Sequence, residues 1–259
     1  MIDFIKLKNE GYTICRGLIS QGWIADLSTA SDVAFRKHRE LQLKNGSEIG
    51  VGGVALHAVL SNRSFIDFLQ YLIDIRFISE LSEGFFKSKC ILNSMSALST
   101  LPMQSNFSSK VHRDLRFYSG EFPVMLNCLV MIDDFTVDNG ATYVLPFSHK
   151  SEKSVSDDFF YKNAIRAVGK SGDVLVFDSN VWHASAPNNT SLQRRGLPIT
   201  ISRSFLKQLL DYPRALGYER MSEFSSELQQ FLGYHSRVPS SLDEWYQAEE
   251  NRFYKKNQD

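Results

Sequence analysis

Two short stretches of the chain carry side chains that bind transition metals. His112 and Asp114 stand one residue apart, and His183 follows in a later segment. Side chains alternate between the two faces of a β-strand, so His112 and Asp114 would share one face while Arg113 points to the other. Two imidazoles and one carboxylate on one side of a metal leave three positions open, which is typical of a non-haem Fe(II) oxygenase. A surface strand with a His/Asp pair is the alternative, because a chain with six histidines can contain His-x-Asp by chance.

The segment before His183 is typical of a buried strand between two turns. Residues 174–177 are apolar, and glycine, aspartate, serine and asparagine stand on either side of them. Arg194 and Arg195 precede a further apolar run at residues 197–205. An arginine near a metal can hold a distal carboxylate through two parallel hydrogen bonds, which a lysine does less specifically. The sequence therefore places a candidate carboxylate anchor after the third candidate ligand.

With these motifs the chain resembles the phytanoyl-CoA dioxygenase family of Fe(II)- and 2-oxoglutarate-dependent oxygenases. Four segments carry the resemblance in the family's order: residues 11–19, 111–115, 133–142 and 144–150. The last of these is similar to the family's Pro-Gly-Ser-His turn, but Phe147 stands where glycine is usual. Residues 232–239 also resemble bacterial members. The resemblance covers most of the chain and is specific for the family, and much less so for the substrate.

The resemblance implies a role for each candidate residue. His112, Asp114 and His183 would bind Fe(II), and the family's arginine and serine stand eleven and two residues after the distal histidine, which matches Arg194 and Ser185. These two residues would anchor 2-oxoglutarate.

Three assignments stay open. Alternation lets only one of Arg194 and Arg195 face the interior of a barrel, so Arg195 remains the alternative anchor. Thr142 is similar to a threonine that contacts 2-oxoglutarate in some relatives. Thr142 and Asn127 would each be either such a contact or a buried polar residue with an ordinary partner.

The family's reaction follows as an expectation. Fe(II), 2-oxoglutarate and O2 would together hydroxylate an unactivated C–H bond of a small-molecule substrate and release succinate and CO2. Halogenating relatives carry glycine or alanine at the position of Asp114, so the carboxylate favours hydroxylation; desaturation, epoxidation and ring formation stay open. The other classes of protein to test are a non-haem iron oxygenase that does not use 2-oxoglutarate and a catalytically silent jelly-roll binding protein.

The remaining histidines and the glycine-rich segment predict no further site. His149 belongs to the turn that is structural in the family, and His38 and His57 would be solvated. His235 would either cap a local segment or line the pocket. Residues 46–53 lack the Gly-Lys-Ser/Thr of a phosphate-binding loop and indicate a mobile loop, with a lid role at the active-site mouth as an expectation from the family.

Composition fits a globular enzyme and adds little more. Lys plus Arg equals Asp plus Glu at 29 each, so bulk charge favours neither nucleic acid nor a membrane as partner. The three cysteines show no Cys-x-x-Cys spacing, which indicates buried free thiols. No signal peptide or long apolar stretch is visible, and the expected location is the cytoplasm. Nothing indicates the oligomeric state.

The order of elements predicts a single domain over residues 1–259. A helical part at about 18–88 would hold a helix at 20–45 and two helices at 62–86. A mainly β core at about 90–206 would form a double-stranded β-helix, the cupin-like jelly roll, with the helices outside one sheet. A helical tail would follow at 207–259. The expected strands are residues 91–98, 124–132, 142–145, 164–168, 174–177 and 197–205.

Overall fold

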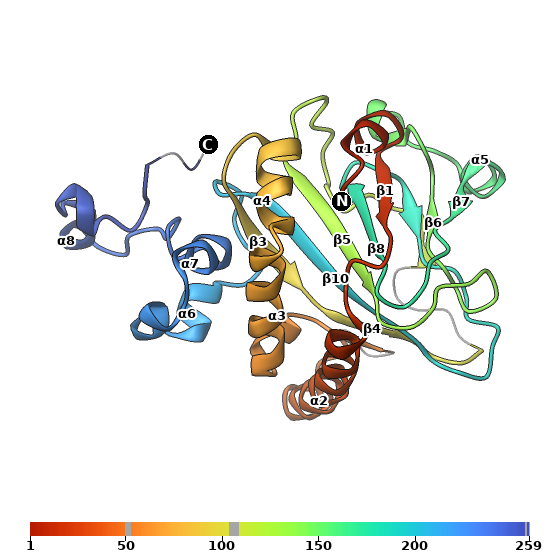
Figure 1. The fold of residues 1–259 in the computed structure, drawn as a ribbon, viewed down its shortest axis with the longest axis horizontal. Coiled ribbons are helices and arrows are strands. Elements are labelled where there is room, and N and C mark those ends of the chain that lie inside the picture. Colours follow the sequence, from red (N-terminus) through yellow and green to blue (C-terminus); the bar gives the residue numbers. More distant parts are fainter. Residues whose placement is uncertain (50–52, 104–108, 257, 259) are drawn as a thin grey trace.

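Two antiparallel sheets face each other, and helices cover the outer face of the larger one (Figure 1). The computed structural model describes residues 1–49, 53–103, 109–256 and 258. The major sheet runs in the order β1-β8-β5-β10-β4-β2, and β3 also pairs with β10. Its strands are β1 (Tyr12–Cys15), β2 (Val54–Ala55), β3 (Cys90–Met95), β4 (Ala97–Thr100), β5 (Met125–Met131), β8 (Val174–Asp178) and β10 (Arg194–Arg203). The minor sheet joins β7 (Ile165–Arg166), β6 (Tyr143–Val144) and β9 (His183–Ala184).

The helices lie mainly on one side of the major sheet and in the C-terminal part. They are α1 (Phe4–Glu10), α2 (Gln21–Asn45), α3 (Arg63–Asp74), α4 (Phe77–Leu81), α5 (Asp157–Asn163), α6 (Tyr212–Leu216), α7 (Ser226–Leu232) and α8 (Leu242–Trp245). Asn62 begins α3 because its side chain accepts a hydrogen bond from the Ser64 N–H, and Gly46 ends α2 in the left-handed conformation. In the part of the chain that the structure describes, no helix is long and apolar enough to cross a membrane.

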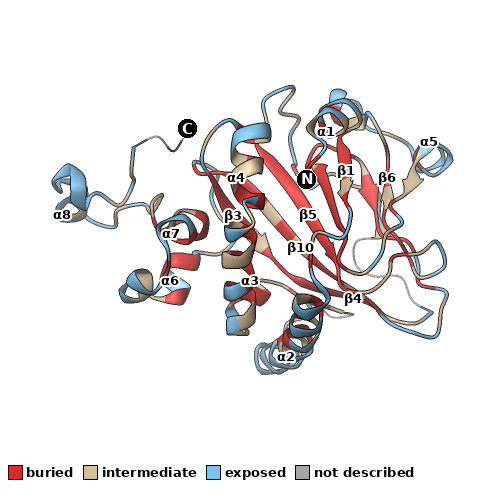
Figure 2. Cartoon of the chain, in the orientation of Figure 1, coloured by how far each residue is buried: buried red, intermediate tan, exposed pale blue. Residues whose placement is uncertain are grey.

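Alternation along β5 separates two apolar layers. Leu126, Cys128 and Val130 pack against the helices, whereas Leu129 and Met131 face the minor sheet. Figure 2 shows the buried strands between exposed helix surfaces and loops. Asn127 lies on the same face as Leu129, so it points into the space between the two sheets. This face is where the polar site residues gather.

The predicted architecture, mainly β with flanking helices in a jelly roll, is confirmed. Several details differ from the expected elements. The run expected at residues 91–98 is two strands, β3 and β4, which pair with different halves of β10. The last strand begins at Arg194 instead of residue 197, and α1 and α5 were not predicted. β1 precedes the helical part and pairs with β8 in the major sheet.

The glycine-rich loop is described only in part. Residues 50–52 lie outside the described residues, so the expected lid role stays a prediction. Gly53 has a positive φ of 106°, and a Cβ there would lie 2.1 Å from the Ser99 carbonyl oxygen. A glycine is therefore needed at position 53 because the backbone there lies so close to β4, and no bound phosphate is needed to explain it.

Candidate active site

His112, Asp114 and His183 lie together although they come from distant segments. His112 and His183 form an antiparallel bridge, with each backbone N–H donating to the other's carbonyl at 3.0 Å. Their ring centroids are 4.2 Å apart. The Asp114 carboxylate lies between them, 3.4 Å from His112 Nε2 through Oδ1 and 3.5 Å from His183 Nε2 through Oδ2. One ligand atom from each residue lies within 4.8 Å of the others, which is close enough for all three to bind one ion.

The second nitrogen of each imidazole determines which nitrogen is free to bind. His112 Nδ1 lies 2.7 Å from the Lys110 carbonyl oxygen, and His183 Nδ1 lies 3.0 Å from the Val181 carbonyl oxygen. A carbonyl only accepts, so both Nδ1 atoms carry the proton and both Nε2 atoms present a lone pair. Two lone pairs and a carboxylate thus converge on one point. When both imidazoles are neutral, no proton lies between these groups, so a cation fits this donor set.

The electrostatics of Asp114 and His183 agree with metal binding. Burial acts to raise the pKa of Asp114, but His183, His112 and Asn127 outweigh it, so the pKa lies below its usual value. Burial lowers the pKa of His183. Burial also acts to lower the pKa of His112, but the neighbouring Asp114 carboxylate raises it overall. An ionised carboxylate and a neutral buried imidazole are the protonation states that metals require.

Arg194 is a buried cation without a carboxylate partner among the described residues. Its side chain is fully buried, and Nη2 donates to Thr100 Oγ1 at 2.8 Å and to the Gly140 carbonyl at 2.9 Å. Nε and Nη1 have no hydrogen-bond partner in the structure. Burial lowers the pKa of Arg194 to about 10, so the guanidinium stays charged at neutral pH. A buried charge is costly unless it is paired, and the two unpartnered N–H groups fit an incoming carboxylate.

Arg195 faces the opposite side of β10 and is already paired. Its Nη2 donates to Asp133 Oδ1 at 2.9 Å and its Nε to Asp133 Oδ2 at 3.1 Å, and Nη1 also contacts Ser28 on α2. Of the two arginines, only Arg194 points into the space between the sheets. The assignment of Arg194 as the carboxylate anchor remains a proposal, and this geometry favours it over Arg195.

Ser185 and Thr142 are also buried on the segments that border this space. Ser185 follows β9 and shares a strand face with His183, and Thr142 directly precedes β6. Gly140, two residues before Thr142, contacts Arg194 through its carbonyl. A Cβ at Gly140 would lie 2.6 Å from the Ala186 carbonyl oxygen, which explains the glycine at this position. Contact of Ser185 and Thr142 with a co-substrate remains a prediction.

Asn127 has a partner that the sequence did not reveal. Its Nδ2 donates to Asp114 Oδ2 and to Ser179 Oγ, both at 2.8 Å, and its Oδ1 accepts from Thr200 Oγ1 at 2.8 Å. The signal in the sequence was a polar residue inside an apolar strand. The identity of the partner required the pairing of β5 with β10, which places Asn127 opposite Thr200.

The other histidines lie outside this cluster. His149 Nε2 contacts the Lys8 carbonyl oxygen at 3.1 Å, which agrees with a structural role. His57 was expected to be solvated, but its Nδ1 lies 2.8 Å from the hydroxyl of the buried Tyr212. His235 contacts Gln229 near the end of α7 at 3.2 Å.

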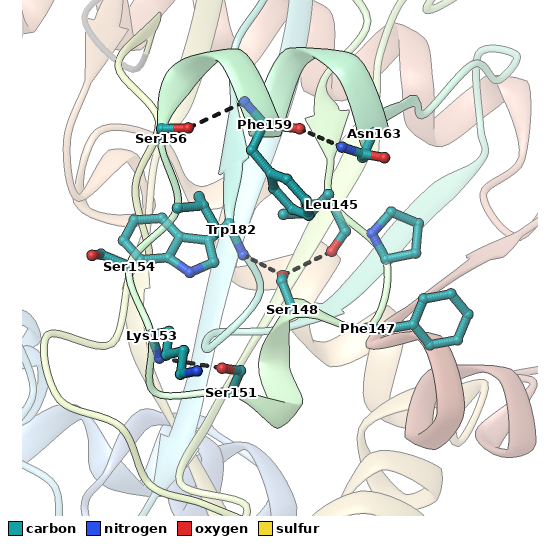
Figure 3. Close-up of a pocket in the computed structure, with 12 residues that line it drawn as sticks. Leu145, Phe147, Ser148, Ser151, Lys153, Ser154, Ser156, Phe159, Asn163 and Trp182 are labelled. Atoms are coloured by element: carbon teal, nitrogen blue, oxygen red, sulfur yellow. Dashed lines mark hydrogen bonds between the residues drawn. The ribbon is translucent and has the colours of Figure 1, made fainter.

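A separate cavity has a volume of about 780 Å³, and none of the predicted site residues lines it (Figure 3). Trp182, Phe159, Leu145 and Ser148 are among its lining residues. Arg113 packs over the Trp182 ring at 4.6 Å and donates to the Ser148 carbonyl at 2.7 Å. Arg113 and Trp182 each neighbour a candidate ligand in sequence. Because adjacent residues of extended chain point to opposite sides, this cavity is on the far side from the candidate metal centre.

Comparison with known proteins places these residues in a family. The family model described as phytanoyl-CoA dioxygenase matches residues 7–196. The chain belongs to this family. A relative from Mycobacterium tuberculosis, itself uncharacterized, is 31% identical over 96% of this chain and 92% of its own length. The dioxygenase FUM3 of Gibberella moniliformis is 26% identical over 90% of this chain and 82% of its own length.

Solved structures with low sequence identity share the fold. AviO1 from Streptomyces viridochromogenes superimposes with a TM-score of 0.59 at 15% identity, over 77% of this chain and 92% of the other. SnoN, a non-haem alpha-ketoglutarate-dependent epimerase from nogalamycin biosynthesis, gives 0.58 at 18% identity, over 77% and 79%. At these identities the likeness concerns the jelly-roll fold alone.

Proposed function

We propose that this member of the phytanoyl-CoA dioxygenase family is an Fe(II)- and 2-oxoglutarate-dependent dioxygenase that hydroxylates an unactivated C–H bond of a small molecule. The observation that supports this most is the buried, unpaired Arg194 guanidinium in the same interior as His112, Asp114 and His183. A metal centre alone would not need a buried cation that lacks a carboxylate partner. A dicarboxylate that reaches from the metal to Arg194 would satisfy both.

Each residue has a defined task in this proposal. His112, Asp114 and His183 would hold Fe(II), and their Nδ1 hydrogen bonds keep the Nε2 lone pairs aimed at one point. Arg194 would pair with the distal carboxylate of 2-oxoglutarate, with Ser185 and Thr142 beside it. Bound iron with 2-oxoglutarate and O2 supplies the oxidising power for C–H cleavage, with succinate and CO2 as products. The chain orients the reactants and keeps water away from them.

Two alternatives have less support. An iron oxygenase that does not use 2-oxoglutarate leaves Arg194 without an anion. A catalytically silent binding protein leaves unexplained why all three metal-binding side chains converge with their lone pairs free.

Succinate release tests the proposal directly. The purified protein with Fe(II), 2-oxoglutarate and O2 should release succinate, slowly without substrate and faster with an accepted one. His183→Ala removes one of three ligands and should abolish turnover and sharply weaken Fe(II) binding. His149→Ala is the control, because this histidine contacts a backbone carbonyl instead of the centre. Full activity of His183→Ala would contradict the metal assignment, and metal binding without succinate release would favour an enzyme of another class.

The type of reaction depends on Asp114. A carboxylate at this position leaves no place for a halide once 2-oxoglutarate and O2 are bound. Hydroxylated product should therefore dominate even in a buffer of high chloride concentration, as measured by mass spectrometry of the product of an accepted substrate. A chlorinated main product would contradict the hydroxylase assignment and leave the fold and the metal site intact.

A further inference from the structure

The hydrogen bonds around Asn127 determine how the Asp114 carboxylate is held. Asn127 and Ser179 are buried, and the Asn127 amide uses both of its N–H groups, one for Asp114 Oδ2 and one for Ser179 Oγ. Its Oδ1 accepts the hydroxyl hydrogen of Thr200. Every polar atom of the amide thus has a partner, which fixes its position and orientation.

The chemistry of the partners allows only one orientation of the amide. A carboxylate that binds a metal is ionised and can only accept, so the amide nitrogen must face Asp114. A flipped amide would place Oδ1 at 2.8 Å from Asp114 Oδ2 with no proton between two acceptors. The Thr200 hydroxyl, which can donate or accept, must then donate to Oδ1. Thr200 on β10 therefore supports the contact that Asn127 on β5 makes with Asp114.

One oxygen of Asp114 is occupied by this contact and the other is not. Oδ2 accepts the Asn127 hydrogen bond at 2.8 Å, which withdraws electron density from that oxygen and prevents rotation of the carboxylate. Oδ1 lies 3.4 Å from His112 Nε2 and accepts no hydrogen bond from an amide of the described residues. Oδ1 is therefore the better ligand of the two.

We propose that Asn127 is a positioning residue that holds Asp114 as a monodentate metal ligand through Oδ1, with Thr200 fixing the Asn127 amide. This inference rests on the proposed metal site. A monodentate carboxylate with two imidazoles leaves three positions open, enough for a bidentate co-substrate and O2. A bidentate carboxylate would leave two, and O2 would then lack a position after the co-substrate binds. Asn127 thus controls the number of open positions without touching the metal.

Mn(II) in water enriched in ¹⁷O tests this by electron paramagnetic resonance, which counts bound waters without any substrate or turnover. The wild-type protein should carry three waters on Mn(II). Asn127→Leu removes all the amide hydrogen bonds and should leave two waters, because Asp114 becomes free to bind through both oxygens. The Mn(II) affinity of this variant should also fall, by about 10- to 100-fold, because the carboxylate is no longer held in one orientation.

Two further variants keep the result interpretable. Asn93→Leu is the matched control: Asn93 is a buried asparagine of the same sheet, and its Nδ2 donates to the Lys207 carbonyl instead of to a candidate ligand. It should keep three waters and the wild-type affinity. Thr200→Val keeps the shape of its side chain and removes only the hydroxyl donor, so it should shift water count or affinity in the direction of Asn127→Leu. If Asn127→Leu fails to fold, Thr200→Val still tests the positioning role of Asn127.

The outcomes separate this inference from the proposed function. If the wild-type protein binds no metal, or if His183→Ala binds it equally well, the proposed metal site is wrong. If the wild-type protein binds Mn(II) with three waters and both Asn127→Leu and Thr200→Val match it in water count and affinity, the metal site stands and the positioning role of Asn127 is wrong. Loss of a water in these variants, but not in Asn93→Leu, supports the role. A loss of affinity with all three waters retained would contradict the control of open positions.

Discussion

Two adjacent arginines show how strongly the environment of one residue decides its chemistry. Arg194 and Arg195 begin the same strand, yet Arg194 is a buried cation with no carboxylate partner among the residues that the structure describes, whereas Arg195 forms a salt bridge with Asp133 at 2.9 Å. The strand alternation turns one side chain toward the minor sheet and the other toward α2. Their functions should therefore separate cleanly in substitution experiments.

Arg194→Ala should raise the 2-oxoglutarate concentration for half-maximal rate. The lost charge-assisted pair in a desolvated site is worth about 2 to 4 kcal/mol, which corresponds to about 30- to 700-fold in affinity. Arg195→Ala is the matched control, and it should leave this concentration nearly unchanged while lowering the midpoint of urea unfolding. Initial rates of succinate release and urea titrations measure both effects. The reverse pattern would mean that Arg195 is the anchor.

At the scale of elements, Asp173 joins the end of β1 to the start of β8. Its buried carboxylate accepts hydrogen bonds from the Gly17 and Lys170 backbone N–H groups at 2.7 and 2.8 Å and from Arg16 Nη1 at 2.7 Å. Burial acts to raise the pKa of Asp173, but these donors outweigh it, so the pKa lies below the usual value. The ladder between β1 and β8 stops at this edge of the sheet, and the hydrogen bonds to the carboxylate continue the connection beyond it.

Asp173→Asn should lower the free energy of unfolding by about 2 kcal/mol at neutral pH, because charged acceptors form the stronger hydrogen bonds. The folded-state pKa is depressed, so this stabilisation is fully present above the unfolded-state pKa and is lost as the pH falls through the folded-state pKa. The difference between wild type and variant should thus shrink below about pH 4. Urea unfolding across this range measures it. Asp134→Asn is the control. It breaks an exposed pair with Lys170 and should lower the free energy of unfolding by less than Asp173→Asn does. An equal loss in the two variants, or a loss in Asp173→Asn that does not depend on pH, would contradict the role given to the Asp173 carboxylate.

At the scale of the whole molecule, the layer between the major sheet and the helices contains all three cysteines. Cys15, Cys90 and Cys128 are free and buried there, as the sequence predicted. Burial raises the pKa of Cys15 and Cys90 to about 11 and also raises that of Cys128. The reactive thiolate form is therefore scarce as well as shielded from solvent.

A thiol reagent such as 5,5′-dithiobis(2-nitrobenzoate) should label none of the cysteines in the folded protein at pH 8 and all three in denaturant. Because the thiols lie in the layer that joins sheet and helices, labelling in intermediate denaturant should follow the unfolding of that layer. Rapid labelling of even one thiol under native conditions would show that the layer opens locally.

The sequence by itself determined the candidate site residues and the order of most of the elements that hold them. His-x-Asp, the distal histidine and the arginine after it are local patterns. The strand expected to carry both His112 and Asp114 is instead an isolated bridge at His112 followed by a bend at Asp114, so their proximity comes from the loop conformation. The apolar runs predicted most of the strands because a buried strand needs a continuous apolar stretch. The short strands β2 and β9 have too few residues to produce such a pattern.

Only the tertiary structure decided which of these residues meet. The bridge between His112 and His183, the pairing of Asn127 with Thr200 and the salt bridge that occupies Arg195 all join segments far apart in the chain. Such pairs depend on strand register, and register is set by how the two sheets pack as a whole. A local pattern contains no information on the partner of a polar residue across a sheet. For this reason Asn127 was visible in the sequence as a polar residue, while its contact with Asp114 appeared only in the folded chain.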